Sequence, residues 1–175
     1  MPPLLIKGGN MIIIVEGIDR VGKTTLCNKL SEKFGIPIHK YKGVLSYNEM
    51  DNYNETDKIL ISFQILKETK SSIILDRMQF SDYVYGVLER NYSIEDAKHN
   101  FEKIDNAICN EDDVFLIYML PTDIEESSRQ HGKDLSVYDE EFYYLFKKSN
   151  IKNKFRCTYN TMDEAIMFIE TRISK

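Results

Sequence analysis

The sequence predicts an α/β fold in which a five-stranded parallel sheet carries helices on both faces. Three short runs, at 11–15, 72–75 and 114–119, are almost entirely apolar and contain many β-branched residues, which is typical of strands buried on both faces. Longer stretches with helical periodicity separate these runs. Such alternation indicates a parallel sheet, because parallel neighbours need long crossover connections.

The remaining elements follow from local patterns along the chain. Two further strands, weaker because polar residues interrupt them, are expected at 37–41 and 155–159. Polar stretches at 44–56 and 128–138 are expected to be loops. Helices are expected where apolar positions recur every three or four residues, at 24–34, 57–70, 81–89, 93–109, 139–149 and 162–173.

Length and composition favour one globular domain. The chain has 175 residues, of which 42% are hydrophobic and 29% charged. Its net charge of -5 argues against non-specific binding to DNA, RNA or anionic membranes, and no apolar run reaches the ~18 residues of a membrane span. Three cysteines without pairing or metal-ligand spacing indicate reduced thiols and a cytoplasmic location. Met11 is a candidate natural start, which would make residues 1–10 a leader or tag before a single domain at 11–175.

A phosphate-binding loop (P-loop) lies between the first strand and the first helix. Residues 17–24 match the pattern G-x-x-x-x-G-K-[ST] in full, in the strand–loop–helix context that the motif requires. The two glycines let the backbone curl so that successive N–H groups point inward, and the helix amino terminus adds partial positive charge. We expect Lys23 to contact the β- and γ-phosphates of ATP and Thr24 to bind Mg²⁺. The full set expected to hold ATP is Gly17, Ile18, Val21, Gly22, Lys23, Thr24 and Thr25.

A second Mg²⁺ ligand is expected at the end of another strand. Asp76 follows the apolar run at 72–75. In a parallel sheet this position faces the P-loop, so the carboxylate can help to hold the metal ion. The alternative interpretation is a residue that only caps the next helix.

The residues around these two motifs resemble the thymidylate kinase family. The segment EGIDRVGKTT at 16–25 is similar to that family's E-G-x-D-R-x-G-K-[ST]-T, and DRMQFS at 76–81 is similar to its D-R-Y-x-F-S, with Met78 in place of Tyr. Phe63 and Lys67 occupy the positions of a base-stacking Phe and of an Arg four residues later. The resemblance implies a P-loop nucleoside-kinase fold with a short lid, dependence on ATP and Mg²⁺, small-molecule nucleotide substrates and a possible homodimer.

The resemblance also implies roles for individual residues. Asp19 would accept a hydrogen bond from the acceptor's 3′-hydroxyl, Arg20 would reach the transferring phosphates, and Arg77 would bind the acceptor's own phosphate. Arginine suits phosphate because its planar, permanently charged fork matches the phosphate oxygens. Further acceptor contacts would come from Phe63, Lys67, Phe80 and Lys42.

The lid is expected at 125–134, after the fourth strand. Arg129 is the candidate for stabilising the charge of the transition state, with Lys133 assisting. A solvated residue at a helix end is the alternative interpretation of Arg129. The histidines neighbour no catalytic pattern and are expected to have structural or surface roles; they are His39, His99 and His131.

Glu16 leaves the nature of the acceptor open. The related deoxynucleoside kinases carry a Glu directly before the first P-loop glycine and use it as the base that deprotonates the 5′-hydroxyl. Their loop lacks the Asp19–Arg20 pair, which favours a monophosphate acceptor, with dTMP to dTDP as the first candidate reaction. Met78 and Lys67 depart from the family pattern and allow an altered acceptor. A deoxynucleoside kinase with Glu16 as general base, and a catalytically silent nucleotide-binding module, are the alternatives.

Overall fold

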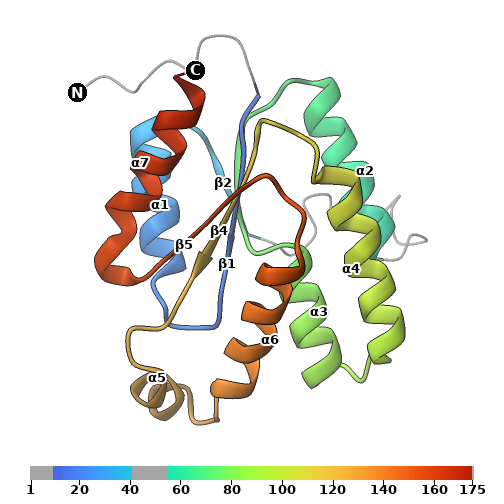
Figure 1. The fold of residues 1–175 in the computed structure, drawn as a ribbon, viewed down its shortest axis with the longest axis vertical. Coiled ribbons are helices and arrows are strands. Elements are labelled where there is room, and N and C mark those ends of the chain that lie inside the picture. The colour runs from blue at the N-terminus through green and yellow to red at the C-terminus, as the bar shows by residue number, and fades with distance from the viewer. Residues whose placement is uncertain (1–9, 41–54, 175) are drawn as a thin grey trace.

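The computed structural model describes residues 10–40 and 55–174. Within these residues it contains a sheet of five parallel strands in the order β2-β3-β1-β4-β5 (Figure 1), which confirms the predicted fold class. The strands are β1 (Ile12–Glu16), β2 (Ile38–Lys40), β3 (Ile73–Asp76), β4 (Val114–Met119) and β5 (Asn153–Cys157). Every residue of β1, β3 and β4 is buried, as expected of strands covered on both faces.

Two groups of helices cover the sheet. In Figure 1, α1 and α7 lie on one face, and α2, α3, α4 and α6 lie on the other. The helices are α1 (Lys23–Phe34), α2 (Glu55–Glu68), α3 (Gln79–Glu89), α4 (Ile94–Ile108), α5 (Ile124–His131), α6 (Ser136–Lys148) and α7 (Met162–Ile173). Among the described residues, no helix is both long enough and apolar enough to cross a bilayer.

The stretch 128–138, expected to be a loop, is largely helical. Helix α5 extends to His131, and α6 begins at Ser136. Asp123 caps the start of α5 by accepting a hydrogen bond from the backbone N–H of Glu126 at 2.9 Å. Gly132, with φ of 76°, ends this helix in the left-handed conformation. These local caps stabilise a helix too short to show a clear apolar period.

The sheet topology brings the ends of three strands together. Central strand β1 pairs with β3 on one side and with β4 on the other. The chain leaves β1 at Glu16, forms the P-loop and enters α1 at Lys23. β3 ends beside it at Asp76, whose position in register is opposite Val15 of β1 and Lys40 of β2. In parallel sheets ligands bind outside the carboxyl ends of the strands, so the fold places the predicted site residues at this edge.

Candidate active site

A pocket of about 870 Å³ opens at the carboxyl edge of the sheet. Its walls come from the P-loop, the start of α1, the ends of β2 and β3, and α5. Seven predicted residues line it, namely Asp19, Arg20, Gly22, Lys23, Thr24, Asp76 and Arg77. Thr24 of the first motif and Asp76 of the second are 52 positions apart in the sequence, yet the two motifs line one cavity.

Two glycines permit the curled conformation of the P-loop. Gly17 has φ of 145°, and a Cβ atom there would lie 2.5 Å from the carbonyl oxygen of Met119. Gly22 has φ of 94°, and its Cβ would lie 2.7 Å from the ring of Tyr159. Both the backbone angle and the close approach exclude a side chain at these positions.

The other residues of the loop divide between core and solvent. The side chains of Ile18 and Val21 are buried in the hydrophobic core, so only their backbone groups can face a phosphate. Thr24 and Thr25, in the first turn of α1, are exposed, and the hydroxyl-bearing Thr24 lines the pocket.

Lys23 lies folded over the inside of the loop. Its side chain is buried, and Nζ donates a hydrogen bond to the carbonyl oxygen of Ile18 at 2.5 Å. Burial, with repulsion from Arg77, lowers the pKa of Lys23 to about 8. Among the described residues, the Ile18 carbonyl is the one hydrogen-bond partner of this buried ammonium, which gains a stronger partner when an anion enters the pocket.

Arg77 is fixed by contacts on several sides. One terminal nitrogen donates to the Gly17 carbonyl and to Ser81 Oγ, both at 3.0 Å, and the other donates to Asp19 Oδ1. The guanidinium also lies 5.1 Å from the ring centre of Tyr85. This places a pre-oriented, permanently charged group in the wall of the pocket.

Asp19 connects the P-loop with two other segments. Its Oδ1 accepts from Arg77, and its Oδ2 lies 3.0 Å from Nε2 of His131, the last residue of α5. Burial on its own raises the pKa of Asp19, but the charges of Arg77 and Lys23 outweigh this and hold the pKa below its ordinary value. Asp19 is therefore ionised at neutral pH. His131, expected to have a structural or surface role, lies against a predicted site residue.

Asp76 and Thr24 form a donor set that fits Mg²⁺. Asp76 is buried, and among the described residues its Oδ1 has no hydrogen-bond partner. A buried carboxylate oxygen without a partner is costly unless a cation or donor binds it. A carboxylate and a hydroxyl beside phosphate oxygens are the hard oxygen ligands that Mg²⁺ prefers, with water completing its shell. The residues present thus fit the ion implied by the sequence motif.

Lys40 and Gln130 line the pocket without having been predicted there. Lys40 is the last residue of β2, opposite Asp76 in register. It supplies a cation from the segment to which sequence reasoning assigned Lys42, which lies outside the described residues. The signal was present in the sequence, because a residue at the end of a parallel strand faces the site.

Comparison with family models and with curated protein sequences finds no match. Solved structures do match. The YorR protein from Bacillus subtilis, in complex with phosphorylated GDP, has a TM-score of 0.66 and 21% identity over 94% of this chain and 99% of that chain. Thymidylate kinases match from Ehrlichia chaffeensis (TM-score 0.58, 16% identity, 94% of this chain and 100% of that chain) and from Candida albicans (0.51, 18%, 95% and 92%). The chain has the thymidylate kinase fold.

Within this thymidylate kinase fold, Phe63 and Lys67 do not reach the pocket. Lys67 donates to Glu111 at 2.5 Å, and Glu111 precedes β4 at the amino edge of the sheet. Phe63 is buried and faces a separate hollow between α2 and α4. The prediction that these residues contact the acceptor base is wrong in this structure. Lys67 lies before β3, at the amino edge of the sheet, whereas Asp76 lies nine positions later at the carboxyl end of β3. The length of β3 therefore separates Lys67 from the pocket.

Phe80 and Arg129 also lie away from the pocket. Phe80 is fully buried and packs edge-to-face against Phe101, with 5.7 Å between ring centres. The Arg129 side chain is 74% exposed and pairs with Glu126 of the same helix at 2.8 Å. The structure thus contradicts the predicted acceptor contact of Phe80, and it favours the solvated interpretation of Arg129.

Glu16 lies beneath the amino terminus of α3. It is fully buried, and Oε1 accepts from the backbone N–H groups of Met78 (2.7 Å), Phe80 (3.0 Å) and Ser81 (3.3 Å). Oε2 accepts from Ser81 Oγ at 2.6 Å. Burial raises the pKa of Glu16, although these hydrogen bonds and Arg77 oppose the increase. Glu16, the last residue of β1, therefore caps the amino terminus of helix α3.

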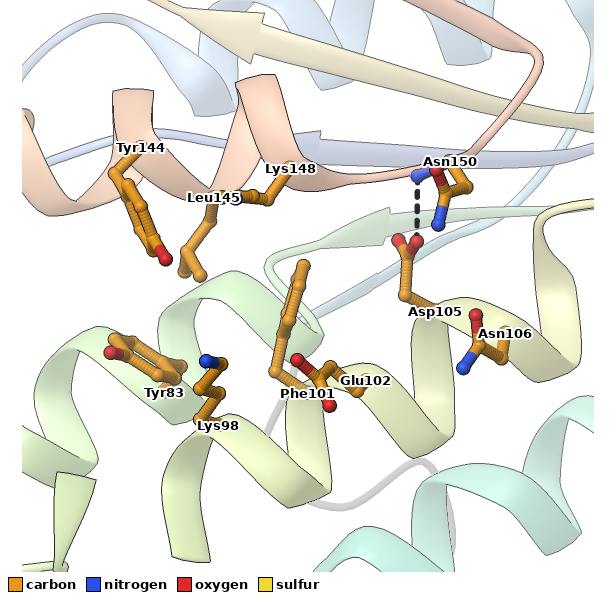
Figure 2. A pocket seen from close by; sticks show the side chains of 10 residues that line it. All are labelled: Tyr83, Lys98, Phe101, Glu102, Asp105, Asn106, Tyr144, Leu145, Lys148 and Asn150. Carbon is orange, nitrogen blue, oxygen red and sulfur yellow. Dashed lines mark hydrogen bonds between the residues drawn. The ribbon is translucent and has the colours of Figure 1, made fainter. Parts of the chain in front are cut away.

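A second hollow, of about 300 Å³, lies between α3, α4 and α6 (Figure 2). The rings of Tyr83, Phe101 and Tyr144 face it. Its buried carboxylate, Asp105, accepts from Ser149 Oγ at 2.6 Å and from the backbone N–H of Asn150 at 2.7 Å. Because both oxygens of this carboxylate already accept hydrogen bonds within the protein, the hollow, as far as the described residues line it, lacks the buried, unpartnered acceptor that the carboxyl-edge pocket has.

Proposed function

We propose that the protein is an ATP-dependent phosphotransferase that phosphorylates a deoxynucleoside monophosphate, with dTMP as the first candidate acceptor. The observation that carries the proposal is the composition of the pocket at the carboxyl edge. Within the described residues, four cationic side chains line this pocket together with a buried carboxylate oxygen of Asp76 that has no hydrogen-bond partner there; they are Arg20, Lys23, Lys40 and Arg77.

Phosphoryl transfer needs positioned cations more than covalent chemistry from the protein. The inward backbone of the P-loop and Lys23 would bind the donor phosphates, with a phosphate oxygen replacing the Ile18 carbonyl as partner of Nζ. Held by Thr24 and Asp76, Mg²⁺ would neutralise phosphate charge. The remaining cations offset the repulsion between donor and acceptor phosphates.

The acceptor side of the pocket is supported by Asp19 and Arg77. The Arg77 guanidinium is already oriented by Gly17, Ser81 and Asp19, so little entropy is lost when it binds an acceptor phosphate. Asp19 is ionised and can accept a further hydrogen bond from a sugar hydroxyl, since each carboxylate oxygen has two lone pairs. A monophosphate is itself an anionic nucleophile and requires no general base.

The geometry of Glu16 argues against a nucleoside acceptor. A general base must come within hydrogen-bond reach of the hydroxyl that it deprotonates. Both oxygens of Glu16 already accept hydrogen bonds at the start of α3, and the side chain does not line the pocket. The pairing of Asp19 with Arg77 beside Lys23 argues likewise against a silent nucleotide-binding module, which needs no such arrangement.

A coupled assay of ADP release tests the proposal. ATP and Mg²⁺ are supplied with each of the eight common nucleoside monophosphates, and separately with thymidine. We expect ADP release with dTMP and none with thymidine. Turnover of thymidine alone would reverse the assignment, and nucleotide binding without transfer to any acceptor would favour the silent module.

A further inference from the structure

Helix α5 ends against the P-loop because of its caps. Asp123 fixes its start, and Gly132 turns the chain immediately after His131. His131 is therefore the last helical residue, and its ring reaches the Asp19 carboxylate across 112 positions of sequence. We call this hydrogen bond the lid contact.

The charge state of Asp19 determines the direction of the lid contact. Asp19 is ionised and can only accept, so the proton of the 3.0 Å hydrogen bond is on Nε2 of His131. The other ring nitrogen, Nδ1, is buried and has no hydrogen-bond partner in the described part of the chain. Among the described residues, Asp19 is therefore the one hydrogen-bond partner that orients the His131 side chain.

The other polar contacts of this segment lead elsewhere. Arg129 pairs with Glu126 within α5. Lys133 pairs with Glu89 and lies 3.3 Å from the hydroxyl of Tyr138, which connects the segment to α3 and α6. Among the described residues, the polar connection from α5 to the P-loop therefore runs through His131 and Asp19.

We propose that His131 is a positioning residue for the acceptor: it holds Asp19 in the rotamer that meets Arg77, and so couples α5 to the acceptor side of the pocket. The inference rests on the proposed function, in which Asp19 and Arg77 bind the acceptor. Oδ1 of Asp19 meets Arg77 while Oδ2 meets His131, so both ends of the carboxylate are fixed. Loss of the His131 bond frees the carboxylate to rotate and disorders the acceptor contacts, while Lys23, Thr24 and Asp76 remain in place for ATP.

Three substitutions of His131 separate the hydrogen bond from mere packing. His131→Ala removes it. His131→Gln places an amide nitrogen near the position of Nε2 and can donate to Asp19, whereas His131→Asn places its amide near the position of Nδ1 and falls short. His99→Ala, at an exposed position of α4, is the matched control.

In steady-state kinetics with ATP and dTMP, we expect KM for dTMP to rise about 10- to 150-fold in His131→Ala and His131→Asn, the range for one charge-assisted hydrogen bond. His131→Gln and His99→Ala should stay close to wild type. KM for ATP should be unchanged in all four variants, because the donor residues are untouched. An unchanged KM for dTMP in His131→Ala overturns the inference and leaves the proposed function intact.

Amide hydrogen exchange of residues 124–131 tests the lid contact without turnover. We expect faster exchange in His131→Ala and His131→Asn than in wild type and His131→Gln. If the wild-type protein phosphorylates no monophosphate, the proposed function fails, and the lid contact is then judged by exchange alone. Equal exchange in wild type and His131→Ala overturns the lid contact in either case.

Discussion

Replacement of Glu16 distinguishes a helix cap from a general base. The carboxylate accepts three backbone N–H groups and the Ser81 hydroxyl in a fully buried setting at the start of α3. Glu16→Ala leaves these four donors without their acceptor. Glu16→Gln keeps one oxygen for the backbone groups, and its amide can donate to Ser81 Oγ, which then becomes the acceptor.

The loss of stability expected for Glu16→Ala follows from the number of hydrogen-bond donors left without an acceptor. A buried donor without a partner costs about 1–3 kcal/mol, and neighbouring losses are not additive. We therefore expect Glu16→Ala to lower the free energy of unfolding by about 3–5 kcal/mol, a large part of the total for a domain of this size. Glu16→Gln should cost less, about 1–3 kcal/mol, because the three backbone N–H groups keep their acceptor and only the Ser81 hydroxyl proton loses its partner.

Urea unfolding at 25 °C measures the stability, and the ADP-release assay measures turnover of the folded variant. A helix cap predicts that Glu16→Gln keeps kcat within about fivefold of wild type, whereas loss of a general base costs about 10²–10⁴-fold. A Glu16→Gln protein that is folded under the assay conditions but whose kcat has fallen at least about 100-fold would refute the helix-cap reasoning. The nucleoside acceptor would then be the better interpretation.

The pKa of Glu16 adds a dependence on pH with a definite sign. Burial raises this pKa above its ordinary value of 4.5, so the folded state holds the proton more tightly than the unfolded state. The contribution of Glu16 to stability is therefore fully present below pH 4.5 and is lost as pH rises toward the raised pKa. Glu16→Gln does not titrate, so the stability of wild type relative to this variant should fall across that window. A difference that grows with pH would contradict the burial argument.

Three further substitutions test the donor side and the lid. Lys23→Ala should lower kcat/KM by about 10²–10³-fold by removing a buried cation from the phosphates, while exposed Lys29→Ala should not; near-normal activity of Lys23→Ala in the ADP-release assay would exclude the assigned phosphate site. Asp76→Asn should raise the Mg²⁺ concentration for half-maximal activity at least about tenfold, and an unchanged Mg²⁺ titration would favour a capping role for Asp76. Arg129→Ala should leave kcat nearly unchanged because its guanidinium is solvated, and a loss near the ~10³-fold expected of a catalytic arginine would show that α5 reorients during turnover.

The parts of the site that could be predicted are those encoded locally. The P-loop is eight consecutive residues whose glycines and lysine determine their own geometry, and Asp76 is placed by the rule that parallel strands end at one edge. Both features depend on fold class, which apolar strands reveal well. They required no knowledge of how distant segments pack.

The parts that were missed or misassigned depend on packing and on strand length. The contact of His131 with Asp19 exists only because α5 folds back over the P-loop, and no local pattern encodes that approach. Lys67 was assigned by its spacing from Phe63, but α2 ends at Glu68, near the amino edge of the sheet, where Lys67 meets Glu111. Spacing within a helix cannot reveal which end of the sheet that helix reaches.

The backbone conformation of Arg20 and Arg77 indicates that the arginine side chains, and not local stability, explain these two residues. Within the described residues, four non-glycine residues have positive φ, and two of these line the pocket: Arg20 at 64° and Arg77 at 81°. Such conformations cost on the order of 1–3 kcal/mol for a residue other than glycine. Glycine would relieve that strain at both positions, so local stability alone does not account for arginine. Arg77 recovers part of the cost through its backbone hydrogen bond to Val15 at 2.9 Å and its contacts with Asp19 and Ser81. Arg20 is exposed and makes no comparable hydrogen bond or ion pair with the described residues, which is the arrangement expected of a cation whose partner is the ligand.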